Sequence, residues 1–195
     1  MPIFQHNVNA IPTPYKLYYE GDYGGANVDA EGGGSIVNGN GELSLYGNSW
    51  VAFKLDTPYS TSGNTRISFN FELVNEAEGH AICVEEDLDE DTFGGFHKRC
   101  IALAGTQYDT WNDNHVKKIE RAEPGNLTQI EPGNGEEDGP GRIMSETVVI
   151  GDLFPESNTL IRYIAFVQDN DAAPYEGVSR FWDIELFEVP PVSSE

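Results

Sequence analysis

The chain has 195 residues, of which 11 are basic and 33 acidic, so its formal net charge at pH 7 is -22. Nucleic acids and anionic membranes attract proteins through basic patches, so this balance argues against both as partners. No apolar run approaches the length needed to cross a bilayer, so we expect no membrane insertion.

Short apolar runs separated by turns rich in glycine and proline extend through the chain, a pattern typical of β-strands. Convincing helical periodicity is absent. We expect strands at residues 15–19, 35–37, 42–46, 50–55, 66–73, 80–84, 100–103, 146–150, 160–168 and 180–189. The pattern predicts one all-β domain over residues 1–189, an antiparallel two-sheet β-sandwich with jelly-roll connectivity.

Four segments carry more specific expectations. An Asn38-Gly39 pair between two apolar runs is a strong hairpin signal. Residues 66–73 alternate strictly, with apolar side chains at 67, 69, 71 and 73, which predicts a half-buried strand. In the last strand we expect Trp182, Ile184 and Leu186 to share one face. Residues 122–142 lack periodicity and are expected to form a long solvated loop.

The turn that follows residues 80–84 is strongly acidic. Its carboxylates are Glu85, Glu86, Asp87, Asp89, Glu90 and Asp91. Their mutual repulsion is relieved either by water, as in a solvated loop, or by a cation such as Ca²⁺, which prefers carboxylate and carbonyl oxygens. Both interpretations stay open at this point, and the spacing is not that of an EF-hand.

Cys83 and Cys100, the two cysteines of the chain, lie in the apolar runs on either side of this acidic turn. If the segment is a hairpin, the two residues lie on neighbouring strands and could form a disulfide. Such a bond would stabilise the fold by about 3 kcal/mol in the chain-entropy model. A pair of buried thiols is the alternative, and an extracytoplasmic location would favour the disulfide.

Four segments together resemble the β-jelly-roll carbohydrate-binding modules of the calcium-binding type that are appended to secreted polysaccharide-acting proteins of aquatic bacteria. The segments are residues 47–50 (GNSW), 105–107 (GTQ), 166–177 (FVQDNDAAPYEG) and 181–188 (FWDIELFE). The resemblance implies a structural Ca²⁺ at the edge of the sandwich, with Asp183, Glu20 and Asp22 as candidate ligands. It also implies a second ion or a sugar-facing site, with Asp169, Asp171, Glu85 and Asp87 as candidates.

Glycan binding needs flat aromatic faces for the sugar ring, together with amides and carboxylates for its hydroxyls. Tyr108 and Trp111 are candidate platforms, close in sequence to Gln107, Asn112 and Asp113. Trp50 could face either the core or a ligand. The polar turn around Trp111 favours ligand contact there, whereas packing is the favoured alternative for the other aromatics.

We therefore predict non-catalytic, calcium-stabilised binding of a polysaccharide. One alternative is a glycoside hydrolase or lyase on the same fold, although the H-E-x-x-H, G-x-S-x-G and P-loop motifs are absent and 33 acids make chance carboxylate pairs uninformative. The other is an extracellular structural or adhesive domain stiffened by calcium.

The two ends of the sequence carry an expectation about location. Residues 1–6 (MPIFQH) lack the basic and apolar regions of a signal peptide, and residues 190–195 resemble the start of a linker. We expect a secreted or cell-surface protein cut from a longer precursor. The sequence does not predict the oligomeric state.

Overall fold

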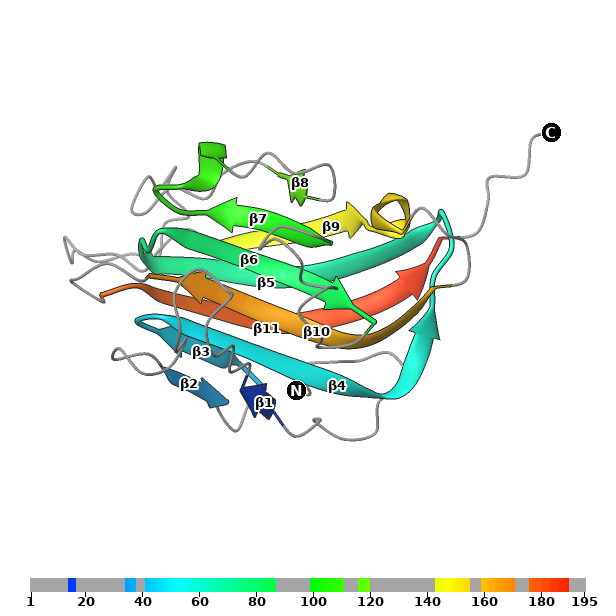
Figure 1. The fold of residues 1–195 in the computed structure, drawn as a ribbon, viewed down its shortest axis with the longest axis horizontal. Helices are drawn as coiled ribbons and strands as arrows, with labels where there is room; N and C mark the ends of the chain where they lie inside the picture. The colour runs from blue at the N-terminus through cyan, green and yellow to red at the C-terminus, as the bar shows by residue number, and fades with distance from the viewer. Residues whose placement is uncertain are drawn as a thin grey trace, which may run out of the picture.

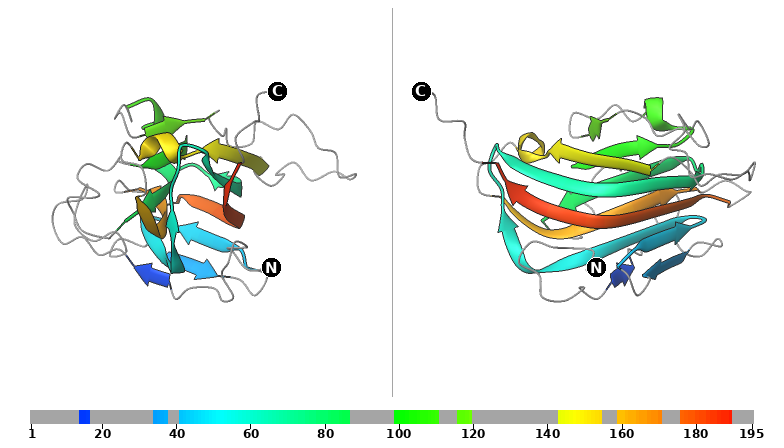
Figure 2. Two further views of the ribbon diagram at one scale, coloured as in Figure 1. Left: turned by 90° about the vertical axis from the view of Figure 1, so that its right-hand side faces the viewer. Right: turned by 180° about the vertical axis from the view of Figure 1, so that it is seen from behind.

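A computed structural model shows two β-sheets stacked face to face, which confirms the predicted all-β sandwich (Figures 1 and 2). The structure describes residues 14–16, 34–37, 41–86, 99–110, 116–119, 143–154, 159–170 and 176–189. The predicted loop at residues 122–142 lies outside these ranges. The jelly-roll connectivity remains a prediction.

One sheet has six strands in the order β1-β4-β10-β6-β7-β8 and the other has five in the order β2-β3-β11-β5-β9. Neighbouring strands are antiparallel except β7 and β8, which are parallel. The strands of the six-stranded sheet are β1 (Pro14–Lys16), β4 (Ser49–Ser60), β10 (Leu160–Asp169), β6 (Gly79–Glu85), β7 (Cys100–Ala104) and β8 (Val116–Lys118). Those of the five-stranded sheet are β2 (Gly34–Val37), β3 (Leu43–Tyr46), β11 (Val178–Glu188), β5 (Thr65–Asn75) and β9 (Ile143–Val149). Two short 3-10 turns, η1 (Tyr108–Thr110) and η2 (Gly151–Leu153), complete the described elements.

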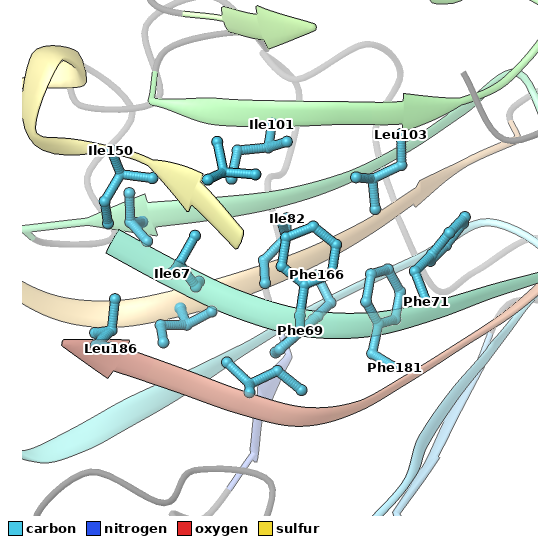
Figure 3. Close-up of a cluster of buried hydrophobic side chains, with 14 of the residues drawn as sticks. Ile67, Phe69, Phe71, Ile82, Ile101, Leu103, Ile150, Phe166, Phe181 and Leu186 are labelled. Atoms are coloured by element: carbon cyan, nitrogen blue, oxygen red, sulfur yellow. The ribbon is translucent and has the colours of Figure 1, made fainter. Parts of the chain in front are cut away.

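The core lies between the sheets and follows from the alternation of the strands (Figure 3). On β5, the apolar residues at 67, 69, 71 and 73 are all buried, as predicted. Phe166 on β10 meets Phe181 on β11 with ring centroids 4.9 Å apart, so aromatic rings join the two sheets at the centre. Burying one large apolar side chain contributes about 1.5 to 3 kcal/mol, and this shared core holds the layers together.

The predicted hairpins are confirmed. Strands β2 and β3 pair in antiparallel register, with Val37 opposite Leu43, around the Asn-Gly segment. Cys83 on β6 lies opposite Cys100 on β7, and the two are joined by a disulfide with Cα atoms 4.0 Å apart. The Val84 N–H donates to the Arg99 carbonyl, so the neighbouring cysteine pair occupies a non-hydrogen-bonded position, where antiparallel strands come closest.

The prediction for the last strand was wrong at Trp182. Trp182 lies opposite Asn70 and Glu185 opposite Ser68, so β11 contains one residue more than β5 over this stretch. This β-bulge reverses the alternation, because the inserted residue takes no place in the ladder. Ile184 and Leu186 are buried in the core as predicted, whereas Trp182 is only partly buried and shares the outer face with Asn70.

A second buried cluster lies on the outer face of the six-stranded sheet, away from the core between the layers. Its members are Trp50, Ala52, Ala81, Cys83, Cys100, Ala102, Tyr108, Ala165 and Val167. Most of these side chains are small, and the disulfide and two aromatic rings supply most of the remaining volume. Two of the candidate ligand-binding aromatics, Trp50 and Tyr108, thus belong to a packed cluster.

Candidate functional site

The outer face of the five-stranded sheet carries an open hollow of about 320 Å³, which we call the Asp183 hollow. It lies over β11, β5 and β9, which run side by side in the right-hand view of Figure 2. Its lining residues are Ser68, Phe69, Asn70, Ser145, Glu146, Thr147, Asp183 and Glu185. Of these, Phe69 and Glu146 are paired with each other in a core-facing row of the sheet, and the other six each present a hydroxyl, an amide or a carboxylate.

The register of the strands explains why this face is hollowed. Residues that lie directly opposite one another on neighbouring strands share a face, so they form rows across the sheet. Two adjacent rows, Trp182-Asn70-Ser145 and Glu185-Ser68-Thr147, have short side chains on β5 and β9. The flanking rows, Arg180-Glu72-Ile143 and Phe187-Arg66-Val149, carry larger ones. The hollow is therefore a strip of short polar side chains between two rows of larger ones.

The bulge places a carboxylate at the centre of this strip. Asp183 has φ 52°, in the left-handed region that few residues other than glycine adopt, although aspartate and asparagine tolerate it better than most. Backbone strain of this kind is often found at functional sites. Asp183 thus occupies a position that a regular strand would not provide.

A chain of hydrogen bonds fixes the side chains of the hollow. The Ser145 hydroxyl donates to Asn70 Oδ1 at 2.6 Å, and Asn70 Nδ2 donates to Asp183 Oδ2 at 3.1 Å. These contacts orient the Asn70 amide and hold the Asp183 carboxylate. A carboxylate can accept about four hydrogen bonds, so the bond from Asn70 leaves Asp183 capacity for a ligand.

A cluster of charged residues bounds the hollow on one side. Arg180 Nη1 lies 3.0 Å from Glu72 Oε2, and Arg180 Nε lies 3.9 Å from Glu42 Oε1. The side chain of Glu72 is only 6% exposed although it belongs to the outer face. The guanidinium of Arg180 is therefore held toward these two glutamates, in the row that borders the hollow.

The candidate ligand-binding residues on the other sheet lie elsewhere. Trp50 is 3% exposed and Tyr108 is 7% exposed, and the Tyr108 hydroxyl donates to the Ile119 carbonyl. Their burial favours the packing role that we weighed for them. Gln107 Nε2 donates to Glu78 Oε1 at 3.2 Å. Trp111, Asn112 and Asp113 lie outside the described residues, and their role stays a prediction.

The described calcium-ligand candidates occupy three separate places. Glu85 lies opposite Tyr163 and Asp169 opposite Gly79, so they mark opposite ends of the β6–β10 pairing. Asp183 is on the other sheet. Glu85 is fully buried and Asp169 partly so. Within the described ranges, no three histidine, cysteine, aspartate or glutamate residues are grouped as a metal site. The remaining candidates, Glu20, Asp22, Asp87 and Asp171, lie outside those ranges.

A scan against models of protein families and a search of curated proteins found no match. In the part of the chain that the structure describes, no helix is long and apolar enough to cross a membrane. The functional argument therefore depends on the chemistry of the hollow.

Proposed function

We propose that the protein is a non-catalytic carbohydrate-binding domain and that the Asp183 hollow is its glycan site. The observation that carries the proposal is the open strip of hydroxyl, amide and carboxylate groups, with Trp182 in the same row as Asn70 and Ser145. Small-ligand sites combine apolar or aromatic surface with a few oriented polar groups, which is the combination found here.

Each group has a role in this proposal. Asp183 and Glu185 accept hydrogen bonds from sugar hydroxyls, and Ser68 and Thr147 both donate and accept. The partly exposed indole of Trp182 offers its face to the C–H groups of a pyranose ring. Because the hydrogen bonds from Ser145 through Asn70 already orient Asp183, less conformational entropy is lost on binding.

Replacing Trp182 with alanine is expected to weaken binding about tenfold, which corresponds to 1.4 kcal/mol, while leaving thermal stability nearly unchanged. The measurement is affinity electrophoresis and calorimetry on a panel of soluble neutral glucans, xylans, mannans and galactans. Tyr46→Ala is the matched control, because Tyr46 is a 37% exposed aromatic on the neighbouring strand β3 that lies opposite Val178, outside the rows that form the hollow. Equal weakening by both substitutions would contradict the assignment of the site.

We also propose that Ca²⁺ stabilises the fold, on the basis of the acidic composition and the resemblance to calcium-binding modules. The described residues do not form a complete ligand shell, so any ion would take ligands from other parts of the chain. Glu85, at the end of β6, is fully buried and keeps its place among the candidate ligands.

Thermal melting tests the calcium proposal. Saturation at 100 times the dissociation constant stabilises a protein by about 2.7 kcal/mol, which predicts an upward shift of about 5 to 10 °C relative to excess EDTA. Magnesium at equal ionic strength is the control, because it screens the net charge of -22 similarly but prefers a smaller octahedral shell. Equal melting temperatures in EDTA and calcium would remove calcium from the proposal and leave the glycan site standing.

Two alternative functions predict different results in the same assays. An enzyme would release reducing or unsaturated ends from a polysaccharide of the panel, whereas the proposed binding domain leaves the polymer intact. A structural or adhesive domain would show the calcium shift but retain no polymer. The disulfide fits an oxidising compartment, which supports the proposed secreted or cell-surface location.

A further inference from the structure

We propose that Asp183 and Glu185 are specificity-determining residues that exclude anionic glycans from the Asp183 hollow. This inference rests on the proposed function, because it concerns the class of glycan that the same site accepts. It predicts a preference for uncharged polysaccharides over uronate-containing or sulfated ones.

The formal charge of the lining is the first step. Asp183 and Glu185 on β11 each carry a carboxylate, and no lysine or arginine is among the described residues that line the hollow. On the bordering rows, Arg180 is paired with Glu72 and Glu42, and Arg66 lies opposite Phe187 and Val149. Among the described side chains of these rows, both arginines thus lie beside the hollow, and Arg180 is already paired with two glutamates there.

The hydrogen-bonding pattern leads to the same preference. An ionised carboxylate only accepts hydrogen bonds, and a sugar hydroxyl can donate one. The oxygens of a uronate or sulfate group are themselves acceptors and cannot donate to Asp183 or Glu185. An anionic group placed against these two carboxylates would lose its bonds to water without gaining replacements from them, and unpaired polar groups are the strongest source of discrimination in binding sites.

The position of Asp183 keeps the charge in place. Its backbone is set by the bulge and its carboxylate accepts a hydrogen bond from Asn70, which in turn accepts one from Ser145. Turning the carboxylate away from a ligand would break this chain. The repulsion is therefore built into the empty site and does not depend on a rearrangement.

The test compares neutral and carboxylated forms of one polymer, namely hydroxyethyl cellulose with carboxymethyl cellulose and methyl-esterified polygalacturonate with polygalacturonate. Affinity electrophoresis at 50 and 500 mM NaCl should show at least tenfold tighter binding of the neutral member of a pair. The Asp183→Asn, Glu185→Gln double variant should reduce this ratio at least fivefold, most clearly at low salt, where charges are least screened.

A matched control separates the hollow from the charge of the whole protein. Asp109→Asn with Glu176→Gln removes the same number of charges from exposed residues that do not line the hollow, and its ratio should stay that of the wild type. An equal change in both double variants would overturn the inference, because the net charge would then set the preference. If the hollow double variant binds no polymer, Glu185→Gln alone decides: an unchanged ratio overturns the inference and a reduced ratio supports it.

The two proposals fail in distinguishable ways. Wild-type protein that binds an anionic member as tightly as its neutral counterpart overturns the specificity inference while the glycan-binding function stands. Wild-type protein that binds no polymer of either class overturns the proposed function and the inference with it.

Discussion

The free energy of unfolding is expected to fall by several kcal/mol on acidification, through the protonation of one histidine. His80 is fully buried on β6, and burial lowers its pKa to about 3. Its Nε2 accepts a hydrogen bond from the Ala77 N–H at 2.9 Å, so the neutral ring carries its proton on Nδ1. Protonation of Nε2 would break this bond and place a charge in the core.

The sign of the effect follows from the two pKa values. In the unfolded chain a histidine titrates near 6.5, so below this pH the unfolded state binds a proton that the folded state does not. Stability contributed by the neutral ring is thus present above pH 6.5 and is lost toward pH 3. The loss approaches about 1.4 kcal/mol per pH unit, or about 5 kcal/mol over the whole interval.

The groups around His80 do not offset this cost. Across the strands it faces Gln168 on β10 and Ala104 on β7, and the Phe71 ring lies 6.0 Å away between centroids. Gln168 is committed to the Gly47 and Gly177 carbonyls and to the Ser179 hydroxyl. Acidification also discharges the 33 acids, which relieves their repulsion, but mainly nearer their ordinary pKa of about 4. The histidine effect is therefore best resolved between pH 6.5 and 5.

Urea unfolding at pH 7, 6 and 5 measures the effect. The wild type should lose about 2 kcal/mol between pH 7 and 5, whereas His80→Gln should lose little, because its amide oxygen can accept the Ala77 N–H but does not titrate. Comparing the slopes of unfolding free energy against pH removes any cost of the substitution that does not depend on pH. Parallel curves for the two proteins would contradict the assignment.

The sequence was sufficient to predict the sandwich because its strands are half-buried, so that apolar and polar residues alternate along them. The residues at 67, 69, 71 and 73 show the period of two that a strand with one core face requires, and the structure buries all four. The cysteine pair was predictable in the same way, because the apolar runs on either side of the acidic turn form a hairpin with these residues in register.

The hollow was only partly predictable. The alternation placed Ser68 and Asn70 on the polar face of β5, but it gave no sign that β9 and β11 lie on either side of them. Pairing between strands far apart in sequence is set by the packing of the whole core. The bulge at Asp183 inserts one residue into β11. Because Trp182 is itself apolar, the sequence from 182 to 186 alternates as a regular strand would, and the hydrophobic pattern gives no sign of the insertion.

Gly105→Ala is expected to destabilise the protein by about 4 kcal/mol or more, enough to lower the melting temperature by roughly 10 °C or to prevent folding. Gly105 follows β7 with φ 124°, a conformation that residues with a side chain rarely adopt. An added Cβ would lie 2.3 Å from the Glu78 carbonyl oxygen and 2.6 Å from Gly79 Cα. Both are backbone atoms, the first in the turn between β5 and β6 and the second at the start of β6, so neither can move aside cheaply.

Gly63→Ala is the matched control, because an added Cβ there meets no atom within 4 Å, and its melting temperature should stay close to that of the wild type. Melting of both variants within about 2 °C of the wild type would contradict the close approach at Gly105. If Gly105→Ala is insoluble while Gly63→Ala is soluble, the comparison still supports the close approach at Gly105.

The close approach at Gly105 also explains what the Gly105-Thr106-Gln107 motif does in this fold. Without a side chain at 105, the chain comes near enough for the Thr106 N–H to donate to the Ala77 carbonyl and the Gln107 N–H to the Glu78 carbonyl. Ala77 is also the residue whose N–H donates to His80. The motif therefore holds the turn that positions the buried histidine, and damage to this contact at Gly105 should also reduce the dependence of stability on pH between 6.5 and 5.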